Sequence, residues 1–136
     1  MTAKERLLAS LLHADRSGAT LRIHEALLAM GFKWKERGQT MMYFSKGALA
    51  EELGLIAIRE GVLSFPRNFW QQRPKVLAEA MNCVSSILRI PLDEKWFSSS
   101  QYSAGQLALD SRTEQAILKC LSNVVVPEAR KAGAKL

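Results

Sequence analysis

The sequence predicts a mainly α-helical fold: a single compact helical domain of about five helices, with one or two small β-hairpins between residues 32 and 65. Two observations lead to this prediction. Apolar residues recur every three or four positions over residues 2 to 15, 20 to 30, 74 to 89 and 111 to 126, the spacing of helices with one face on a core. Between residues 32 and 44 the period shortens to two, which is typical of strands.

The first two predicted helices form a short antiparallel pair. Thr2 is placed to cap a helix that runs to about Asp15. A second helix begins near Thr20, and Gly31 is placed to end it, because glycine adopts the left-handed conformation at little cost.

Two hairpins are expected next. Residues 32 to 37 and 40 to 44 flank a turn at Gly38 and Gln39, and residues 55 to 58 and 62 to 65 flank a three-residue loop, 59 to 61. The second segment also fits helical spacing, so a continuing helix is its alternative. Between the two, Ser45 is expected to cap a helix that ends at Gly54.

Pro74 is expected in the first turn of a central helix that reaches about Arg89. Residues 92 to 105 are read as an irregular connection, with a short helical turn over 104 to 109. Ser111 and Glu114 match a capping box that opens the last major helix, and Pro127 is expected to end it. The predicted organisation is a globular domain over residues 1 to 126 and a basic tail over 127 to 136.

Composition fits one ordinary domain, since the chain has 136 residues, 48% of them hydrophobic and 24% charged. No apolar run approaches the roughly 20 residues of a membrane span, and no secretory signal is recognised. We therefore expect a cytoplasmic protein that does not bind membranes. Cys83 and Cys120 both fall in apolar helical patterns, where free cysteine behaves as a small buried hydrophobe.

Charge indicates an anionic partner. The net charge is +6, and residues 33 to 75 hold eight Lys or Arg against four Glu. A basic region of this kind favours nucleic acid, either DNA or RNA, although a role in solubility is the alternative.

Two groups of basic and aromatic residues are the candidate nucleic-acid-binding site. Their cations can neutralise phosphates, and an exposed ring can stack on an unpaired base. The alternative for the rings is that they anchor the core or an interface. The residues are Lys33, Trp34, Lys35, Arg37, Arg67, Phe69, Trp70, Arg73 and Lys75.

No catalytic motif is recognised, and no metal site or cofactor is expected. Residues 49 to 55 resemble the first helix and turn of a helix-turn-helix, but residues 56 to 61 do not supply a recognition helix. The sequence therefore predicts a non-enzymatic nucleic-acid-associated binding protein, as a small subunit of a larger nucleoprotein assembly. The alternative is a protein-protein interaction module or inhibitor that uses Trp34, Phe69 and Trp70 as exposed anchors, with homo-oligomerisation as one form of it.

Overall fold

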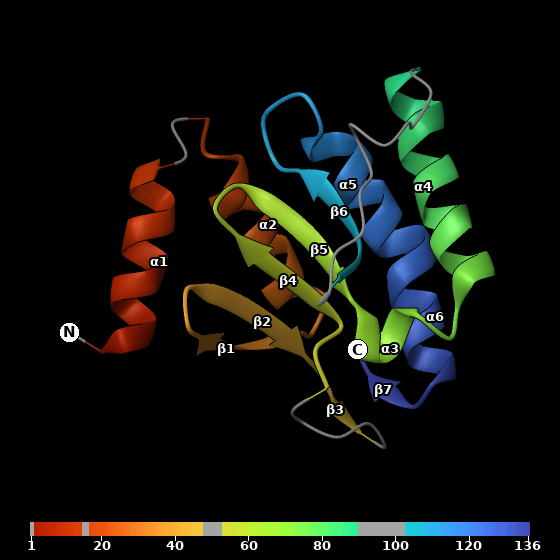
Figure 1. Cartoon of the computed structure of the whole chain (residues 1–136), viewed down its shortest axis with the longest axis horizontal. Coiled ribbons are helices and arrows are strands. Elements are labelled where there is room, and N and C mark those ends of the chain that lie inside the picture. The colour runs from red at the N-terminus through yellow and green to blue at the C-terminus, as the bar shows by residue number, and fades with distance from the viewer. Residues whose placement is uncertain (1, 15–16, 48–52, 90–102) are drawn as a thin grey trace.

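The computed structural model describes residues 2 to 14, 17 to 47, 53 to 89 and 103 to 136. Figure 1 shows how the helices and strands of these residues are arranged. In chain order they are α1 (Ala3–Ala14), α2 (Ala19–Ala29), β1 (Lys33–Arg37), β2 (Thr40–Phe44), β3 (Lys46–Gly47), β4 (Ile56–Arg59), β5 (Val62–Pro66), α3 (Arg67–Trp70), α4 (Pro74–Leu88), β6 (Ser103–Ala108), α5 (Glu114–Cys120), a π-helical segment η1 (Leu121–Val125), α6 (Val126–Lys131) and β7 (Ala134–Lys135).

The fold is α+β, and the prediction of a mainly α-helical fold is wrong. A five-stranded antiparallel sheet has the order β1-β2-β4-β5-β6. The two predicted hairpins exist, but they are joined, because β2 pairs with β4 in the register Met41↔Ile58. β6 then pairs with β5, with Leu63 opposite Leu107. Joining the hairpins lets their apolar residues form one continuous face.

Both hairpin turns follow from local sequence. Gly38 has φ 63° in the β1–β2 turn, and Glu60 and Gly61 have φ 49° and 73° in the β4–β5 turn. The two successive positive φ values of the β4–β5 turn define a type I′ turn, which matches the twist of paired strands. Arg59 pairs with Val62, so the loop has two residues where three were predicted. The hairpin reading of residues 55 to 65 is confirmed over the helical one.

Two predicted helices are strands or extended chain where the structure describes them. The helix expected from Ser45 to Gly54 starts instead with β3, which pairs with β7; residues 48 to 52 lie outside the described chain. The residues that follow the helix-turn-helix resemblance form β4, so no recognition helix is present there. The helical turn expected over 104 to 109 is β6.

The helix limits were predicted well at α1, α2 and α4. The Glu5 amide donates to the Thr2 hydroxyl at 3.1 Å, which confirms the predicted cap of α1. Gly31 follows α2 with φ 103°, in the left-handed region. α4 starts at Pro74 and ends one residue before the predicted limit at Arg89.

The start of α5 differs from the predicted capping box. The Asp110 carboxylate accepts hydrogen bonds from the amides of Arg112 and Thr113 at 2.9 and 3.0 Å. Glu114 turns away from the cap and forms an ion pair with Arg22 of α2 at 2.7 Å. The acid at this position therefore links two helices.

Pro127 does not end the last helix. The Val126 amide donates to the Leu121 carbonyl five residues earlier, so η1 has π-helical hydrogen bonding, and α6 continues with Pro127 in its first turn. There the missing N–H of proline breaks no α-helical hydrogen bond. Residues 127 to 136, predicted as a basic tail, lie in α6 and β7, where Ala129 is buried and the Arg130 guanidinium donates to the Leu136 carbonyl at 3.0 Å.

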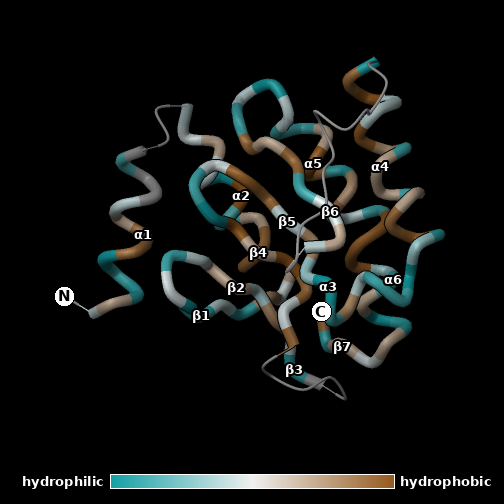
Figure 2. Tube along the Cα trace, viewed as in Figure 1, coloured by the Kyte–Doolittle hydropathy of each residue, from teal (hydrophilic) through white to brown (hydrophobic). Residues whose placement is uncertain are grey.

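The core lies between one face of the sheet and the helices. β4, β5 and α5 carry hydrophobic segments at the middle of the molecule (Figure 2). None of the described helices is long and apolar enough to span a bilayer. The residues of the sheet that are buried against the helices are Met41, Tyr43, Ile56, Ile58, Leu63, Phe65 and Leu107.

Candidate nucleic-acid interface

Alternation along the strands places basic residues on the sheet face opposite the helix layer. Successive side chains of a strand point to opposite faces, and residues paired directly across strands share a face. Met41 and Tyr43 are buried in the core, so Met42 and its β1 partner Lys35 lie on the other face. Lys33 and Arg37 are two residues from Lys35 and share that face.

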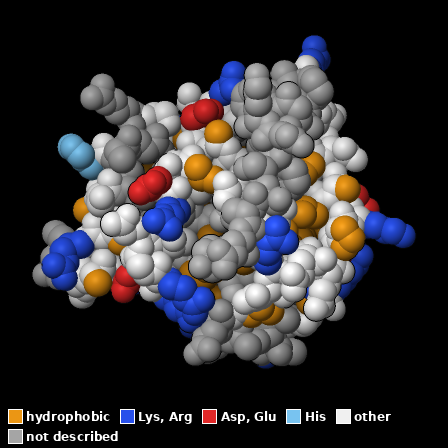
Figure 3. All heavy atoms as spheres, viewed as in Figure 1, with side chains coloured by type: hydrophobic (Ala, Val, Ile, Leu, Met, Phe, Trp, Pro, Cys, Tyr) orange, Lys and Arg blue, Asp and Glu red, His pale blue; other side chains and the backbone are white. Residues whose placement is uncertain are grey.

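Two further arginines lie on the same face. Arg59 follows the buried Ile58 in β4 and is exposed. Arg67 begins α3 directly after β5. Arg59 and Arg67 line one hollow in this face together with Arg37. We call Lys33, Lys35, Arg37, Arg59 and Arg67 the basic sheet face. Figure 3 shows Lys and Arg side chains spread over the side of the molecule turned toward the viewer.

Charge is segregated between the two sides of β1. Lys33, Lys35 and Arg37 lie on the basic sheet face, whereas Glu36 faces α1 across a cavity. Among the described residues that line the hollow in the basic sheet face, Glu60 is the acidic one. A surface that contributes only to solubility usually has positive and negative side chains interspersed, whereas like charges gathered on one face repel one another. The arrangement therefore favours a bound anion.

The hollow, which we call the sheet cleft, has a volume of about 510 Å³. Its floor is low because small residues occupy the middle strands: Ala57 of β4 pairs with Ser64 of β5. Arg59 and Arg67 lie at its margins. The other described residues that line it are Arg37, Thr40, Met42, Gly54, Glu60, Val62, Pro66, Asn68, Ser103 and Gln106.

The two aromatic residues nearest the β1 cations lie on opposite faces. Trp34 lies on the helix side, where the Lys4 ammonium is 4.3 Å from its ring centroid and the His24 ring packs edge-on at 5.2 Å. Phe44, paired with Lys33, is half-buried on the basic sheet face, and the Lys35 ammonium lies 5.5 Å from its ring centroid. Phe44, rather than Trp34, is the ring beside the cations.

The predicted aromatic residues of the second group are in the core. Phe69 is 1% exposed and Trp70 0% exposed. Their rings meet edge-on with centroids 4.9 Å apart, and the Trp70 indole N–H donates to the Leu55 carbonyl at 2.8 Å. This placement leaves neither ring open to a base or to a protein partner, and it matches the alternative that they anchor the core.

The predicted cations Arg73 and Lys75 lie away from the basic sheet face. The Arg73 guanidinium donates to the Phe69 carbonyl at 2.8 Å and pairs with Glu128 at 3.4 Å. Its central carbon lies 3.9 Å from the Phe69 ring centroid. Lys75 is exposed on the first turn of α4, in the helix layer. Of the predicted cations, the structure brings together Lys33, Lys35, Arg37 and Arg67.

Sequence reasoning missed Arg59, Phe44 and the neutral cleft residues Ser64 and Gln106. Their common signal is register, since Lys35, Met42, Ala57, Ser64 and Gln106 form one row across the whole sheet. The alternation of Ile56, Ala57, Ile58 and Arg59 indicates which face Arg59 takes. This alternation places Arg59 on the same face as the β1 cations only once β2 and β4 are known to pair.

The helix side of β1 holds a buried polar pair. His24 Nδ1 and the Tyr43 hydroxyl are 2.6 Å apart, and both residues are buried. Burial lowers the pKa of His24, with Glu25 opposing this shift and Lys4 adding to it. Burial also raises the pKa of Tyr43. The pair is therefore neutral at neutral pH, and it links α2 to β2, the strand that pairs with β1.

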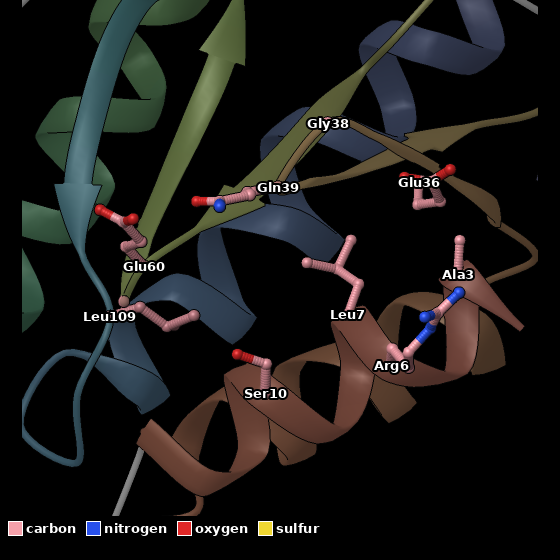
Figure 4. Close-up of a pocket in the computed structure, with 10 residues that line it drawn as sticks. Ala3, Arg6, Leu7, Ser10, Glu36, Gly38, Gln39, Glu60 and Leu109 are labelled. Carbon is pink, nitrogen blue, oxygen red and sulfur yellow. The ribbon is translucent and has the colours of Figure 1, made fainter. Parts of the chain in front are cut away.

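A second cavity, of about 690 Å³, lies between α1 and the two hairpin turns. Figure 4 shows Leu7 and Ser10 of α1 on one side of it and Gln39, Glu60 and Leu109 on the other. We call it the α1 cavity. Its lining mixes apolar side chains with the opposite charges of Arg6, Glu36 and Glu60, so it lacks the excess of positive charge in the sheet cleft, which Arg37, Arg59, Arg67 and Glu60 line.

The described residues offer no cluster of three or more His, Cys, Asp or Glu side chains that could hold a metal ion. Both cysteines are free; Cys120 is buried, which raises the pKa of its thiol to about 12, whereas Cys83 is half-buried. The chain matches no known protein family, no curated protein and no solved structure. The basic sheet face is thus the feature from which a function is inferred.

Proposed function

We propose that this protein binds nucleic acid through the basic sheet face and acts by binding rather than by catalysis. The observation that carries the proposal is the collection of Lys33, Lys35, Arg37, Arg59 and Arg67 on one face of the sheet. Cations placed along such a face neutralise successive phosphates and release their counterions, which supplies binding energy independent of sequence. A cytoplasmic location and a place in a larger nucleoprotein assembly belong to the same proposal.

Rigidity supports the assignment. β1 is held by its full pairing to β2 and by the packing of Trp34 against His24 and Lys4 on the helix side. Cations fixed on a strand lose less conformational freedom on binding than cations on a loose segment. The described acidic residues, apart from Glu60, lie on helices, beside α5 or on the α1 side of β1, so they weaken the positive potential of the face little.

The test is binding of fluorescein-labelled oligonucleotides of about 12 residues, measured by anisotropy over a salt series. The variant Lys33→Gln/Lys35→Gln/Arg37→Gln is expected to bind about a hundredfold or more weakly at about 50 mM salt. Its plot of log affinity against log salt is expected to be shallower by about 2 to 3, because each of the three lost phosphate contacts removes about 0.7 to 0.9 from the slope.

The matched control is Lys75→Gln/Lys119→Gln/Lys131→Gln, which removes the same charge from exposed positions of the helix layer. It is expected to keep nearly all of the affinity and the slope. Equal losses in the two variants would mean that binding follows net charge and not the basic sheet face, and would overturn the proposal. Urea unfolding of both variants checks that the fold is intact.

A further inference from the structure

The sheet cleft has the shape of a trough whose depth is set by side-chain size. Across the row from Lys35 to Gln106, the middle positions are Ala57 and Ser64, the smallest side chains of the row. Ala57 is 4% exposed and Ser64 is half-buried, so Ser64 is the part of this low stretch that a ring entering the hollow can contact. Arg59 lies at one end and Arg67 at the other.

The trough offers neutral hydrogen-bonding groups between its cations. Thr40 and Ser64 carry hydroxyls and Asn68 an amide, groups that both donate and accept hydrogen bonds. Such groups suit the edges of bases more than phosphates, because a phosphate only accepts. Phe44 lies beside this row, two residues along β2 from Met42, and its half-buried ring has the Lys35 ammonium 5.5 Å from its centroid.

Duplex recognition requires a different shape. Base edges of B-form DNA are reached by a helix or a two-stranded ribbon that enters the major groove. On the basic sheet face the described residues form the broad surface of a sheet with a hollow in it, and α3, which supplies Arg67 and Asn68 to its lining, is only four residues long. A recessed surface with cations at its margins suits unpaired bases turned toward the protein.

We infer that the partner of the basic sheet face is single-stranded nucleic acid, with one or more unpaired bases held in the sheet cleft and the phosphates along the cations. This inference rests on the proposed function and deepens it. The 2′-hydroxyl is the group that separates RNA from DNA, so both strands share the recognised chemistry and are compared directly.

The experiment measures three probes of one mixed sequence of about 12 residues: single-stranded RNA, single-stranded DNA and the DNA duplex, at equal salt. Either single strand is expected to bind at least about tenfold more tightly than the duplex, because stacking and base-edge contacts add to the shared phosphate contacts. The tighter of the two single strands identifies the preferred sugar. Equal or tighter duplex binding would overturn the inference.

Filling the cleft provides an independent test. Ser64→Leu places a larger side chain on the cleft floor without changing charge, and is expected to remove most of the preference for single strands while duplex binding and the salt slope stay. Ala108→Leu is the matched control, since Ala108 is exposed in β6 and does not line the cleft. If Ser64→Leu melts early, Thr40→Leu serves instead, at the first position of β2.

The outcomes separate the two claims. Salt-dependent binding that is equal for single strands and duplex leaves the proposed function standing and overturns the single-strand inference. Binding of no probe at low salt overturns both. An unchanged preference for single strands in correctly folded Ser64→Leu or Thr40→Leu overturns the role of the cleft.

Discussion

Two segments that each carry three cations and a tryptophan, residues 33 to 37 and 67 to 75, have different roles in the structure. In β1 a period of two sends Lys35 and its like-charged neighbours to the basic sheet face and Trp34 to the helix side. In the second segment, a helical turn puts Phe69 and Trp70 into the core, and Arg73 folds back over them. Backbone geometry, more than composition, decides which cations lie on the basic sheet face.

The largest expected effect is on folding, at the second segment. Trp70→Ala removes a fully buried ring and its bond to the Leu55 carbonyl, and is expected to lower the free energy of unfolding by about 3 to 5 kcal/mol. Trp34→Ala, at a half-buried position, is expected to cost about 1 to 2 kcal/mol. Urea unfolding followed by circular dichroism measures both; equal losses would contradict the contrast between the segments.

The next expected effect contrasts two cations: Arg73 is expected to contribute to stability, and Lys35 to oligonucleotide binding. Arg73→Ala loses a charged hydrogen bond to the Phe69 carbonyl and the packing on its ring, and is expected to lower stability by about 1 to 2 kcal/mol with affinity for oligonucleotides nearly unchanged. Lys35→Ala is expected to keep its stability and bind about tenfold more weakly. Unfolding and anisotropy are measured on both variants. The reverse pattern would place the interface on the second segment.

The two sides of β1 are expected to respond to different solution variables. Burial lowers the pKa of His24 below its ordinary value of 6.5, so the unfolded chain binds a proton that the folded chain does not. That contribution to stability is present above pH 6.5 and is lost as the pH falls below it. His24→Gln should flatten this part of the stability profile, measured by unfolding in buffers of about pH 5.5 to 7.5.

The control for this pH effect is His13→Gln, at an exposed position of α1, which should keep the wild-type profile. Affinity for oligonucleotides, in contrast, should follow salt through the basic sheet face. A His24→Gln profile that still falls with the wild-type slope below about pH 6.5 would contradict the assignment of His24.

The smallest expected effect is at the β4–β5 turn. Glu60 has φ 49°, which asparagine adopts more readily, so Glu60→Asn is expected to stabilise the fold by about 0.5 kcal/mol. It also removes an acid from the lining of the sheet cleft and should raise affinity about twofold. Glu36→Gln, on the α1 side of β1, is the control for charge. Equal gains in affinity for Glu60→Asn and Glu36→Gln would mean that oligonucleotide binding does not depend on which side of the sheet an acid occupies.

Local signals were sufficient where an element forms from its own residues. The cap at Thr2, the glycines after α2 and in the turns, and Pro74 at the start of α4 all act within a few residues along the chain. β6 shows the opposite case. Its sequence of small and polar residues, 103 to 108, has little strand preference, and it is extended because it pairs with the open edge of β5.

The candidate site likewise contains residues that local signals identified and residues that only the strand pairing placed there. The cations of β1 were found because their period of two is local, whereas Arg59 and Phe44 join them only through the pairing of β2 with its neighbours. Phe69 and Trp70 could not be assigned from composition, because an aromatic residue beside a cation is equally common in a core and on a surface. Burial against Leu55 and Phe65 decided between the two.

The sequence by itself determined the two hairpins, most of the helix limits, the concentration of positive charge in residues 33 to 75 and the alternation that divides β1. These features depend on turns, caps and periodicity, which act over short separations in the chain. Only the tertiary structure decided that the hairpins form one sheet, that helices cover one of its faces and that Arg37 joins Arg59 and Arg67 around a cleft. Those depend on contacts between residues far apart in the chain, whose pairing is selected by burial of one continuous apolar face.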